Sequence, residues 1–225
     1  MYIEKICKNI SDKLQSELNL DDDKKSIVEY GIFALFNMGI SILLVALTGL
    51  LIGVIVESLI ISFTGAILRK FSGGAHASTS ISCSILGVII SVLPAKVIKY
   101  CTFNTYFIII IGFFIFAISY FIIYRLAPVD SPNKPIKKLE KIKKLKKGSI
   151  IILTIYMVIV IFNIIIYYIT KNNIFLVYSI CIYVGTLWQV FTLTKLGHII
   201  VNILDLILIN ILNILRGSKN EKIKQ

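Results

Sequence analysis

Six apolar stretches, each about twenty residues long, set the strongest limit on what this chain can fold into. An α-helix rises about 1.5 Å per residue, so about 17 to 25 apolar residues cross the roughly 30 Å hydrocarbon core of a bilayer. The sequence therefore predicts an all-α, polytopic membrane protein with six transmembrane helices. They are expected near residues 28–48, 51–68, 79–98, 105–125, 150–170 and 174–194.

The composition agrees with a membrane protein. The apolar fraction of 57% and the mean hydropathy of +0.87 exceed those of water-soluble domains, which run near half apolar. The net charge of +12 does not point to nucleic acid, because the basic residues lie between the apolar stretches instead of in one basic domain. Residues 1–25 lack the apolar core and cleavage site of a signal peptide, so we expect the first span to be retained.

The cysteines do not form a metal or disulfide pattern. There is no CxxC pair among the four of them, and only two histidines are present as further ligands. We therefore expect no metal and no cofactor. Cys101 and Cys181 lie in or beside apolar spans and are interpreted as small buried apolar side chains.

The distribution of lysine and arginine predicts the orientation. Cytoplasmic loops keep an excess of these residues. Here the N-terminal segment, the 69–78 loop, the 125–149 loop and the C-terminal tail are basic, and they alternate with nearly uncharged loops. Both termini are therefore expected in the cytoplasm. Gly49 and Gly53 are expected to supply the tight turn between the first two spans.

Two flanking segments have amphipathic patterns. In residues 1–25 an apolar stripe recurs at helical spacing opposite a charged face, which is typical of a helix lying in the headgroup plane. In residues 195–225 a polar stripe interrupts an apolar helix, and a seventh span would export the basic tail. We therefore predict one integral membrane domain over residues 1–225, with a six-span core over 28–194 and an interfacial helix at each end. The polar stripe consists of His198, Asn202, Asp205 and Asn213.

One segment, RKFSGGAHASTSISC (Arg69 to Cys83), carries the candidate chemistry. In a straight helix His76 and Cys83 would lie about 10 Å apart along the axis, whereas a nucleophile and its base need hydrogen-bond distance, roughly 3 Å. The chain is therefore predicted to leave helical geometry between Gly73 and Ser78 if the two act together. The Gly73–Gly74 pair permits such a bend because glycine adopts backbone conformations that other residues resist.

The start of the third span favours a reactive thiol. A helix N-cap within Ser78 to Ser80 would leave His76 on the loop and Cys83 in or near the first turn. The positive end of a helix stabilises a thiolate, and a neighbouring imidazolium does so more strongly. A Cys–His pair for nucleophilic acyl transfer is one interpretation. A buried cysteine, a plain glycine turn and a basic topology signal remain the simpler alternatives.

The segment resembles the signature of the accessory gene regulator B family, the membrane peptidases that process autoinducing-peptide precursors in Gram-positive quorum sensing. That family has an arginine, a Gly-Gly-Ala-His run and a cysteine seven residues after the histidine. The sequence APVDSPNKPIKK at 127–138 resembles the family's proline-containing basic loop, and the likeness covers essentially the whole chain. The matching positions are Arg69, Gly73, Gly74, Ala75, His76 and Cys83.

The resemblance implies a cysteine endopeptidase (thiol protease) in a Gram-positive cell membrane. Cys83 would attack a peptide carbonyl of an AgrD-like precursor, and His76 would act as base and then as acid. A cysteine or serine within the peptide would then attack the thioester and form a cyclic thiolactone or lactone. The resemblance also implies a homodimer and a precursor with an acidic segment after the cleavage point.

Several roles stay open at the level of sequence. Arg69 is either a cytoplasmic anchor or a ligand for a precursor carboxylate. Glu57 is an intramembrane carboxylate, and its depth favours a structural pairing with Lys96 or Lys99. No acidic residue near the motif is evident to orient His76. Oxyanion donors are expected at the start of the third span, around Cys83.

The lysine-rich 134–147 loop is expected to attract anionic lipid headgroups and an acidic precursor tail. The main alternative function is a small membrane transporter or exporter of a peptide without covalent catalysis, and a structural subunit is another. Few intramembrane charges beyond Glu57 and no matched pair of broken helices argue against transport. The lack of an HExxH motif argues against a metalloprotease.

Overall fold

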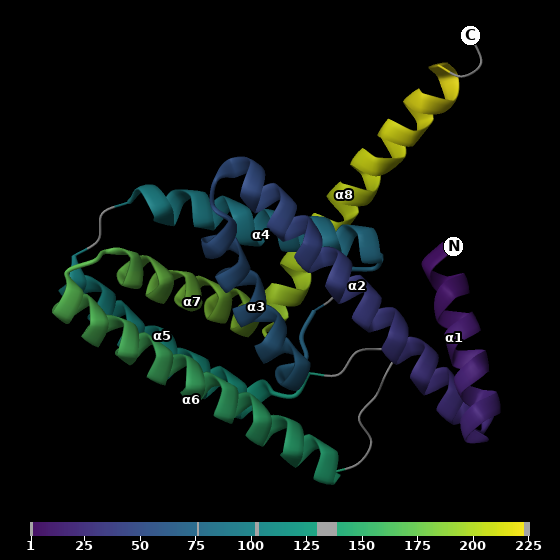
Figure 1. The fold of residues 1–225 in the computed structure, drawn as a ribbon, viewed down its shortest axis with the longest axis horizontal. Coiled ribbons are helices and arrows are strands. Elements are labelled where there is room, and N and C mark those ends of the chain that lie inside the picture. The colour runs from purple at the N-terminus through teal and green to yellow at the C-terminus, as the bar shows by residue number, and fades with distance from the viewer. Residues whose placement is uncertain (1, 76, 102–103, 130–138, 223–225) are drawn as a thin grey trace.

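The computed structural model describes residues 2–75, 77–101, 104–129 and 139–222, and these form eight α-helices and no strand. The all-α prediction is confirmed. The helices, coloured along the chain in Figure 1, are α1 (Tyr2–Leu18), α2 (Asp22–Ile52), α3 (Ile55–Ser72), α4 (Ser80–Tyr100), α5 (Thr105–Leu126), α6 (Leu139–Thr170), α7 (Ile174–Phe191) and α8 (Lys195–Lys222).

Six of these helices are long and apolar enough to cross a membrane: α2, α4, α5, α6, α7 and the stretch Lys195–Ile214 of α8. The predicted number of six apolar helices long enough to span a membrane is confirmed. The set differs from the prediction at two helices, because α8 is included and α3 is not. α3 is not among the six because it carries Glu57, Arg69 and Lys70 within 18 residues. The apolar stretch of α8 is among them, so its interfacial placement stays a prediction.

α3 nevertheless lies in the middle of the bundle, against α2, α4, α6 and α7 (Figure 1). Close packing with α7 depends on small residues. A Cβ atom at Gly185 would lie 2.7 Å from the Ile61 carbonyl oxygen and 2.8 Å from the Thr64 Cβ. The Tyr156 hydroxyl of α6 donates a hydrogen bond to the Thr64 carbonyl at 2.9 Å. α3 is therefore held on two sides by the helices that form the apolar core.

The turn between α2 and α3 forms at one of the two predicted glycines. Gly53 has a φ of 78°, the left-handed conformation that ends a helix, and its N–H donates to carbonyls of the last turn. Gly49 remains inside α2, where a Cβ atom would collide with the Ser58 hydroxyl. Gly49 therefore allows the two helices of the hairpin to approach closely.

The basic segment after α5 is more helical than predicted. α6 begins at Leu139, eleven residues before the predicted span, so most of the lysines expected in a 125–149 loop lie on a helix. Leu139, Ile142 and Leu145 recur at helical spacing there. The Lys146 ammonium lies 4.8 Å from the centre of the Tyr124 ring, which ties this turn to the end of α5. The predicted loop residues 130–138 lie outside the described residues.

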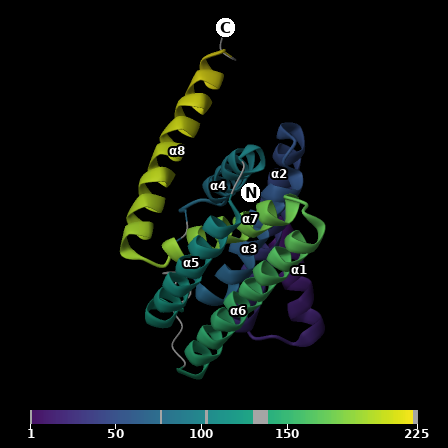
Figure 2. The ribbon, with the colours of Figure 1, turned by 90° about the vertical axis from the view of Figure 1, so that its left-hand side faces the viewer.

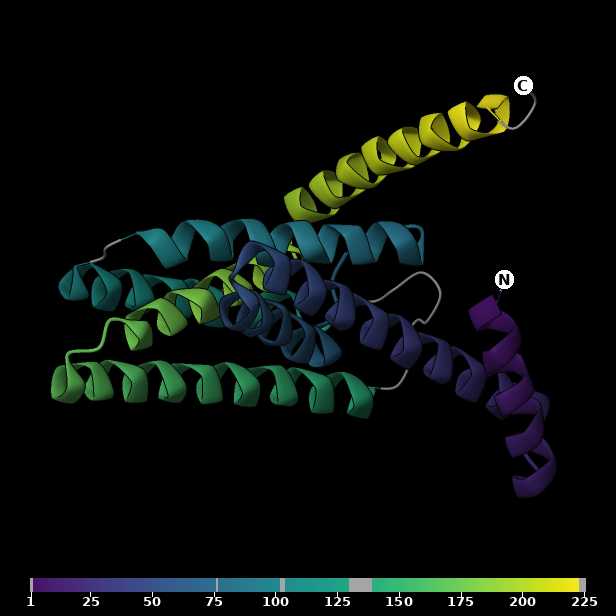
Figure 3. The ribbon, with the colours of Figure 1, turned by 45° about the horizontal axis from the view of Figure 1, so that its top comes forward.

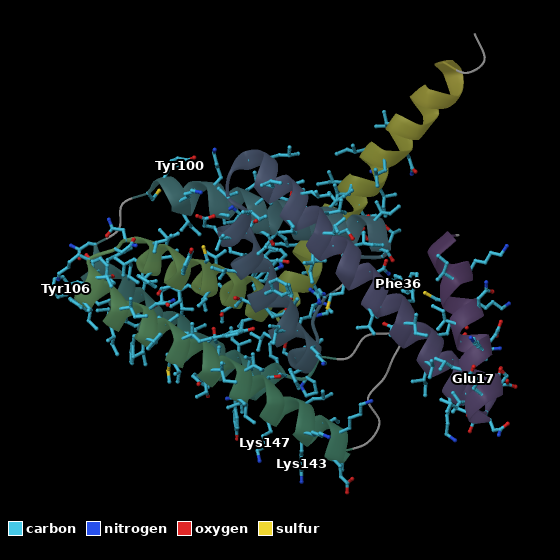
Figure 4. All side chains as sticks on the ribbon, viewed as in Figure 1. Glu17, Phe36, Tyr100, Tyr106, Lys143 and Lys147 are labelled. Atoms are coloured by element: carbon cyan, nitrogen blue, oxygen red, sulfur yellow. The ribbon has the colours of Figure 1, made fainter. Side chains whose placement is uncertain are left out.

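The two ends of the bundle differ in chemistry, as Figure 4 shows. Lys143 and Lys147 lie at the start of α6, and the exposed Tyr100 and Tyr106 lie at the opposite end of the bundle. Lysines are enriched on the cytoplasmic side of membrane proteins, and tyrosines are enriched at both membrane interfaces. This arrangement fits a bundle whose α6 lysines face the cytoplasm.

The terminal helices lie outside the bundle. α1 lies across the start of α2 (Figure 3), where Cys7 and Ser11 are buried and the Lys25 ammonium is 2.5 Å from Asp12 Oδ1. The isoleucines Ile6 and Ile10 of its apolar stripe stay exposed. The prediction of an amphipathic N-terminal helix is confirmed, and its place at the membrane surface stays a prediction.

α8 extends away from the other helices beyond α4 (Figures 1 and 2). Most of its apolar side chains are exposed, Leu206 and Ile214 among them. Asp205 is different, because only 6% of it is exposed where α8 passes the start of α4. The contact of α8 with the bundle is therefore short and includes a carboxylate.

Gly185→Ala tests the packing of α3 on α7. The added methyl group has no room, so we expect the free energy of unfolding in detergent to fall by about 1 to 3 kcal/mol. Gly87→Ala is the matched control, because a Cβ atom there meets nothing within 4 Å. The control should be neutral or stabilise the helix by up to about 1 kcal/mol. Equal effects of the two substitutions would contradict the close packing.

Candidate functional site

The segment between α3 and α4 leaves helical geometry where the spacing of His76 and Cys83 requires it. α3 ends at Ser72 and α4 begins at Ser80, with Gly73 at φ 69° and Gly74 at φ 130°. The N-cap of α4 is Thr79, inside the predicted range of residues 78 to 80. The predicted bend is confirmed. His76 itself lies outside the described residues.

Both glycines of the bend are needed for space as well as for conformation. Positive φ values of this kind are strained for any residue with a side chain. A Cβ atom at Gly73 would collide with the Val129 carbonyl, and one at Gly74 would lie 2.6 Å from Thr192 Oγ1. Gly73 and Gly74 therefore support the site by letting the loop pass close to the chain after α5 and to the end of α7.

Side chains and backbone of other helices satisfy the hydrogen bonds of this loop. The Gln189 amide of α7 donates to Ser72 Oγ at 3.0 Å and to the Gly73 carbonyl at 2.7 Å. The Ala75 N–H donates to the Thr192 carbonyl at 3.0 Å. After α5, the Val129 N–H donates to the Ser72 carbonyl at 2.9 Å. The loop is thus attached to α7 by at least three hydrogen bonds.

Gln189 and Thr192 were not singled out by the sequence analysis. Gln189 is 1% exposed, although glutamine is seldom buried without a partner. A glutamine inside the apolar stretch 174–194 is the signal that would have identified it. The sequence does not show which backbone groups the amide binds, because its partners lie more than a hundred residues earlier.

Cys83 is the fourth residue of α4, with a free thiol that is half-buried. Its backbone N–H donates to the Thr79 carbonyl at 3.0 Å, and the Ser82 N–H donates to Thr79 Oγ1 at 3.1 Å. Both N–H groups are therefore used by the helix and its cap. Oxyanion donors at the start of α4 stay a prediction, and they would be N–H groups other than these two.

Arg69 is hydrogen-bonded to the loop and lies within electrostatic range of the Cys83 thiol. Its Nη2 donates to the Ala75 carbonyl, and its guanidinium interacts electrostatically with Cys83. The buried Nε has no partner among the residues that the structure describes. Arg69 therefore does more than mark one end of α3, because it is bonded to the loop and interacts electrostatically with Cys83.

α8 supplies a further contact to the loop. Asp205 Oδ2 accepts a hydrogen bond from the Ser78 N–H at 2.8 Å, across 127 residues of sequence. The sequence analysis placed Asp205 only in the polar stripe of the C-terminal helix. The structure brings a carboxylate to within two residues of His76, where no acidic residue had been evident.

Glu57 lies at the other end of α3 and takes no part in this cluster. Its carboxylate is 3.4 Å from the Lys99 ammonium, which also donates to the Gly53 carbonyl at 2.5 Å. The predicted structural pairing with Lys99 is confirmed. No set of three His, Cys, Asp or Glu side chains gathers as metal ligands in the part of the chain that is described.

Comparison with known proteins identifies the family of the chain. The family model Accessory gene regulator B matches residues 7–193. The chain belongs to the accessory gene regulator B (AgrB) family. Membership gives it the general AgrB role in processing the autoinducing peptide of quorum sensing, with an AgrD-like peptide as substrate. Together with the six apolar helices, it makes the chain a multi-pass cell-membrane protein.

Two relatives from Clostridium perfringens carry AgrB-like in their names. The protein of strain SM101 is 45% identical and that of strain 13 is 43% identical. Each alignment extends over 206 residues, 90% of this chain and 96% of the relative. No solved structure matches the chain. The AgrB match contains the motif, Gln189 and Thr192, and it ends before α8 begins.

Gln189→Leu tests the attachment of the loop to α7. Leucine has a similar volume but removes the donor that Gln189 supplies to the buried Ser72 hydroxyl and to the half-buried Gly73 carbonyl, so we expect the free energy of unfolding to fall by about 1 to 3 kcal/mol. Thr186→Val is the matched control one turn earlier, because the buried Thr186 hydroxyl has no partner among the described residues. It should be neutral or stabilising in the same detergent unfolding assay. A Gln189→Leu protein as stable as Thr186→Val would contradict the attachment.

Proposed function

We propose that this AgrB-family protein is a membrane cysteine endopeptidase. It cleaves the autoinducing-peptide precursor through a thioester on Cys83 and promotes cyclisation of the product. The observation that carries the proposal is the position of Cys83: a half-buried free thiol at the start of α4, within electrostatic range of Arg69 and directly after a glycine loop attached to α7.

The surroundings of Cys83 favour the thiolate. The N-terminal end of α4 carries a partial positive charge, and the Arg69 guanidinium adds a full one nearby. In the proposed topology this end of α4 faces the cytoplasm, where thiols stay reduced. In the sequence His76 lies in the segment between the two glycines and the start of this helix. A thiolate nucleophile with an imidazole partner is the arrangement that acyl transfer requires.

Cleavage is the first half of the reaction. His76 takes the thiol proton of Cys83, and the sulfur attacks the carbonyl carbon of the scissile peptide bond. The C–N bond then breaks, and the leaving amine takes the proton from His76. The N-terminal part of the precursor stays on Cys83 as a thioester, and the acidic C-terminal segment is released.

Cyclisation is the second half. A cysteine or serine within the bound peptide gives its proton to His76 and attacks the thioester carbon, and Cys83 leaves and recovers the proton. The product is a thiolactone or a lactone. The attacking group is held close, which raises its effective molarity, and a site at the membrane surface restricts competing water.

The basic start of α6 supports an acidic substrate. Several exposed lysines, Lys143 and Lys147 among them, lie on this helix (Figure 4). They would attract both anionic lipid headgroups and the acidic tail of the precursor. The proposal includes cytoplasmic termini, a Gram-positive cell membrane and a homodimer. The last two follow from the family likeness.

Cys83→Ala tests the nucleophile. The protein is reconstituted in liposomes with an AgrD-like precursor that contains an internal cysteine and an acidic tail. Cleavage is measured by mass spectrometry. We expect Cys83→Ala to lose activity by on the order of 10⁴-fold or more, because no other group replaces the thiolate. Cys101→Ala is the matched control. The predicted burial of Cys101 is wrong, because this cysteine lies just past the other end of α4, where it is exposed.

A second measurement tests the thioester. A precursor whose internal cysteine is replaced by alanine cannot cyclise, so its N-terminal fragment should accumulate on Cys83 and be released by hydroxylamine. Undiminished cleavage by Cys83→Ala would overturn the proposed function. Cleavage by the wild-type protein without a Cys83 adduct would overturn the covalent mechanism.

A further inference from the structure

An apolar groove of about 380 Å³ lies between α4 and α7. Both helices are among the six that are apolar enough to cross a membrane, and Leu93 and Leu187 on the rim of the groove are exposed. A charged group would lose its hydration in such surroundings, so the groove suits an apolar occupant. Its lining includes Ile90, Leu93 and Pro94 of α4 and Val184, Leu187 and Trp188 of α7.

Cys83 lies on the same face of α4 as the groove. Cys83, Gly87, Ile90 and Pro94 follow one another at intervals of four, three and four residues, a spacing that keeps side chains on one face of a helix. Ile90 and Pro94 line the groove. Between them and the thiol lies Gly87, where a Cβ atom would meet nothing within 4 Å. The thiol and the groove therefore share one strip of α4 whose middle position is open.

Pro94 changes the hydrogen bonding of this strip. Proline has no N–H, so it cannot donate to the backbone carbonyl four residues earlier, which here belongs to Ile90. The Ile90 carbonyl thus lacks its usual helical donor at a position that lines the groove. In a bilayer a backbone carbonyl needs a donor from the protein or from a bound group, because water is scarce. A peptide in the groove has such donors, and a lipid acyl chain has none.

The length of the strip defines which part of a peptide reaches the groove. Along the helix axis Ile90 lies about 10 Å and Pro94 about 16 Å from Cys83. An extended peptide covers about 3.3 to 3.6 Å per residue. A precursor that is attached to Cys83 and runs along the strip therefore brings the residues about three to five positions before the cleavage point into the groove.

We propose that the groove between α4 and α7 is the subsite for this segment of the precursor and selects large apolar side chains in it. The Ile90 carbonyl accepts a backbone N–H of the same segment. The acidic segment after the cleavage point is excluded from the groove by its charge and stays on the side of the basic residues. This inference rests on the proposed function and names the part of the substrate that the protein recognises.

Trp188 gives a direct measurement of binding, because it is the only tryptophan of the chain and lines the groove. The Cys83→Ala protein in liposomes is mixed with a precursor that carries an internal cysteine, an acidic tail and one 4-nitrophenylalanine, whose ring quenches a nearby indole. We expect about half of the fluorescence or more to be lost when the quencher lies three to five residues before the cleavage point. A quencher in the acidic tail should remove less than about a tenth.

A lipid is the competing occupant, and brominated lipid tests for it. Phosphatidylcholine that is brominated in its acyl chains quenches Trp188 where lipid fills the groove. Unlabelled precursor should restore about a third or more of the lost fluorescence, because it displaces the lipid. No recovery above the wild-type KM of the precursor would overturn the inference and leave the groove as a lipid site. Equal quenching from the two positions of the nitrophenyl ring would also overturn it.

Gly87→Phe closes the strip between the thiol and the groove. It should lower kcat/KM for an apolar precursor by about tenfold or more, a loss typical of a pocket that no longer fits its side chain. Alkylation of Cys83 by iodoacetamide should stay within about twofold of the wild-type rate, because the small reagent does not need the groove. Gly31→Phe on α2 is the matched control, since a Cβ atom there also meets nothing within 4 Å. Equal losses of kcat/KM in the two variants would contradict the subsite.

The substrate gives a complementary test. Serine at the three to five positions before the cleavage point should cost the wild-type protein about tenfold or more in kcat/KM and cost Gly87→Phe little, because the two changes remove the same contact. Equal costs in the two proteins, with Cys83→Ala inactive, would overturn this inference alone. Cleavage by Cys83→Ala would overturn the proposed function and leave the fluorescence result standing.

Discussion

The hydrogen bonds from Gln189 to the break between α3 and α4 are the interaction on which the site depends. A chain cannot leave helical geometry near the membrane unless its freed N–H and C=O groups find partners inside the protein. Gln189 donates to the Gly73 carbonyl and to the Ser72 hydroxyl, the Val129 N–H donates to the Ser72 carbonyl, and the Thr192 carbonyl accepts from the Ala75 N–H. With those groups satisfied, the chain can end α3 at Ser72 and begin α4 at Ser80, which places Cys83 at the fourth residue of the new helix.

The charged side chains at the two ends of α3 have different kinds of partner. At one end Glu57 is neutralised by Lys99 at 3.4 Å, which makes the carboxylate structural. At the other end Arg69 has no carboxylate partner among the described residues, and it faces a carbonyl and a thiol instead. A cation kept free of a permanent counter-ion is available to stabilise negative charge on Cys83. The difference explains why only one end of this helix is proposed to be reactive.

The sequence was sufficient for the features that local pattern determines. Hydrophobic length predicts the helical class and five of the six apolar spans. The Gly73–Gly74 pair predicts the bend, and the capping residues predict the start of α4. The roles of Gln189 and Asp205 did not follow, because their partners lie more than a hundred residues away. The early start of α6 was missed because a lysine run resembles a loop by charge, although its leucines and isoleucine repeat at helical spacing.

The distance in sequence between the loop and Gln189 also sets an order of events during synthesis. The Gly73 carbonyl and the glutamine that binds it are separated by 116 residues. At the usual speed of translation the ribosome needs on the order of 10 s to make that length of chain. During this interval α3 and α4 exist without the residue that fixes the bend between them. Cys83, the proposed nucleophile, is therefore made early, and the surroundings that would activate it are assembled only when the bundle is nearly complete.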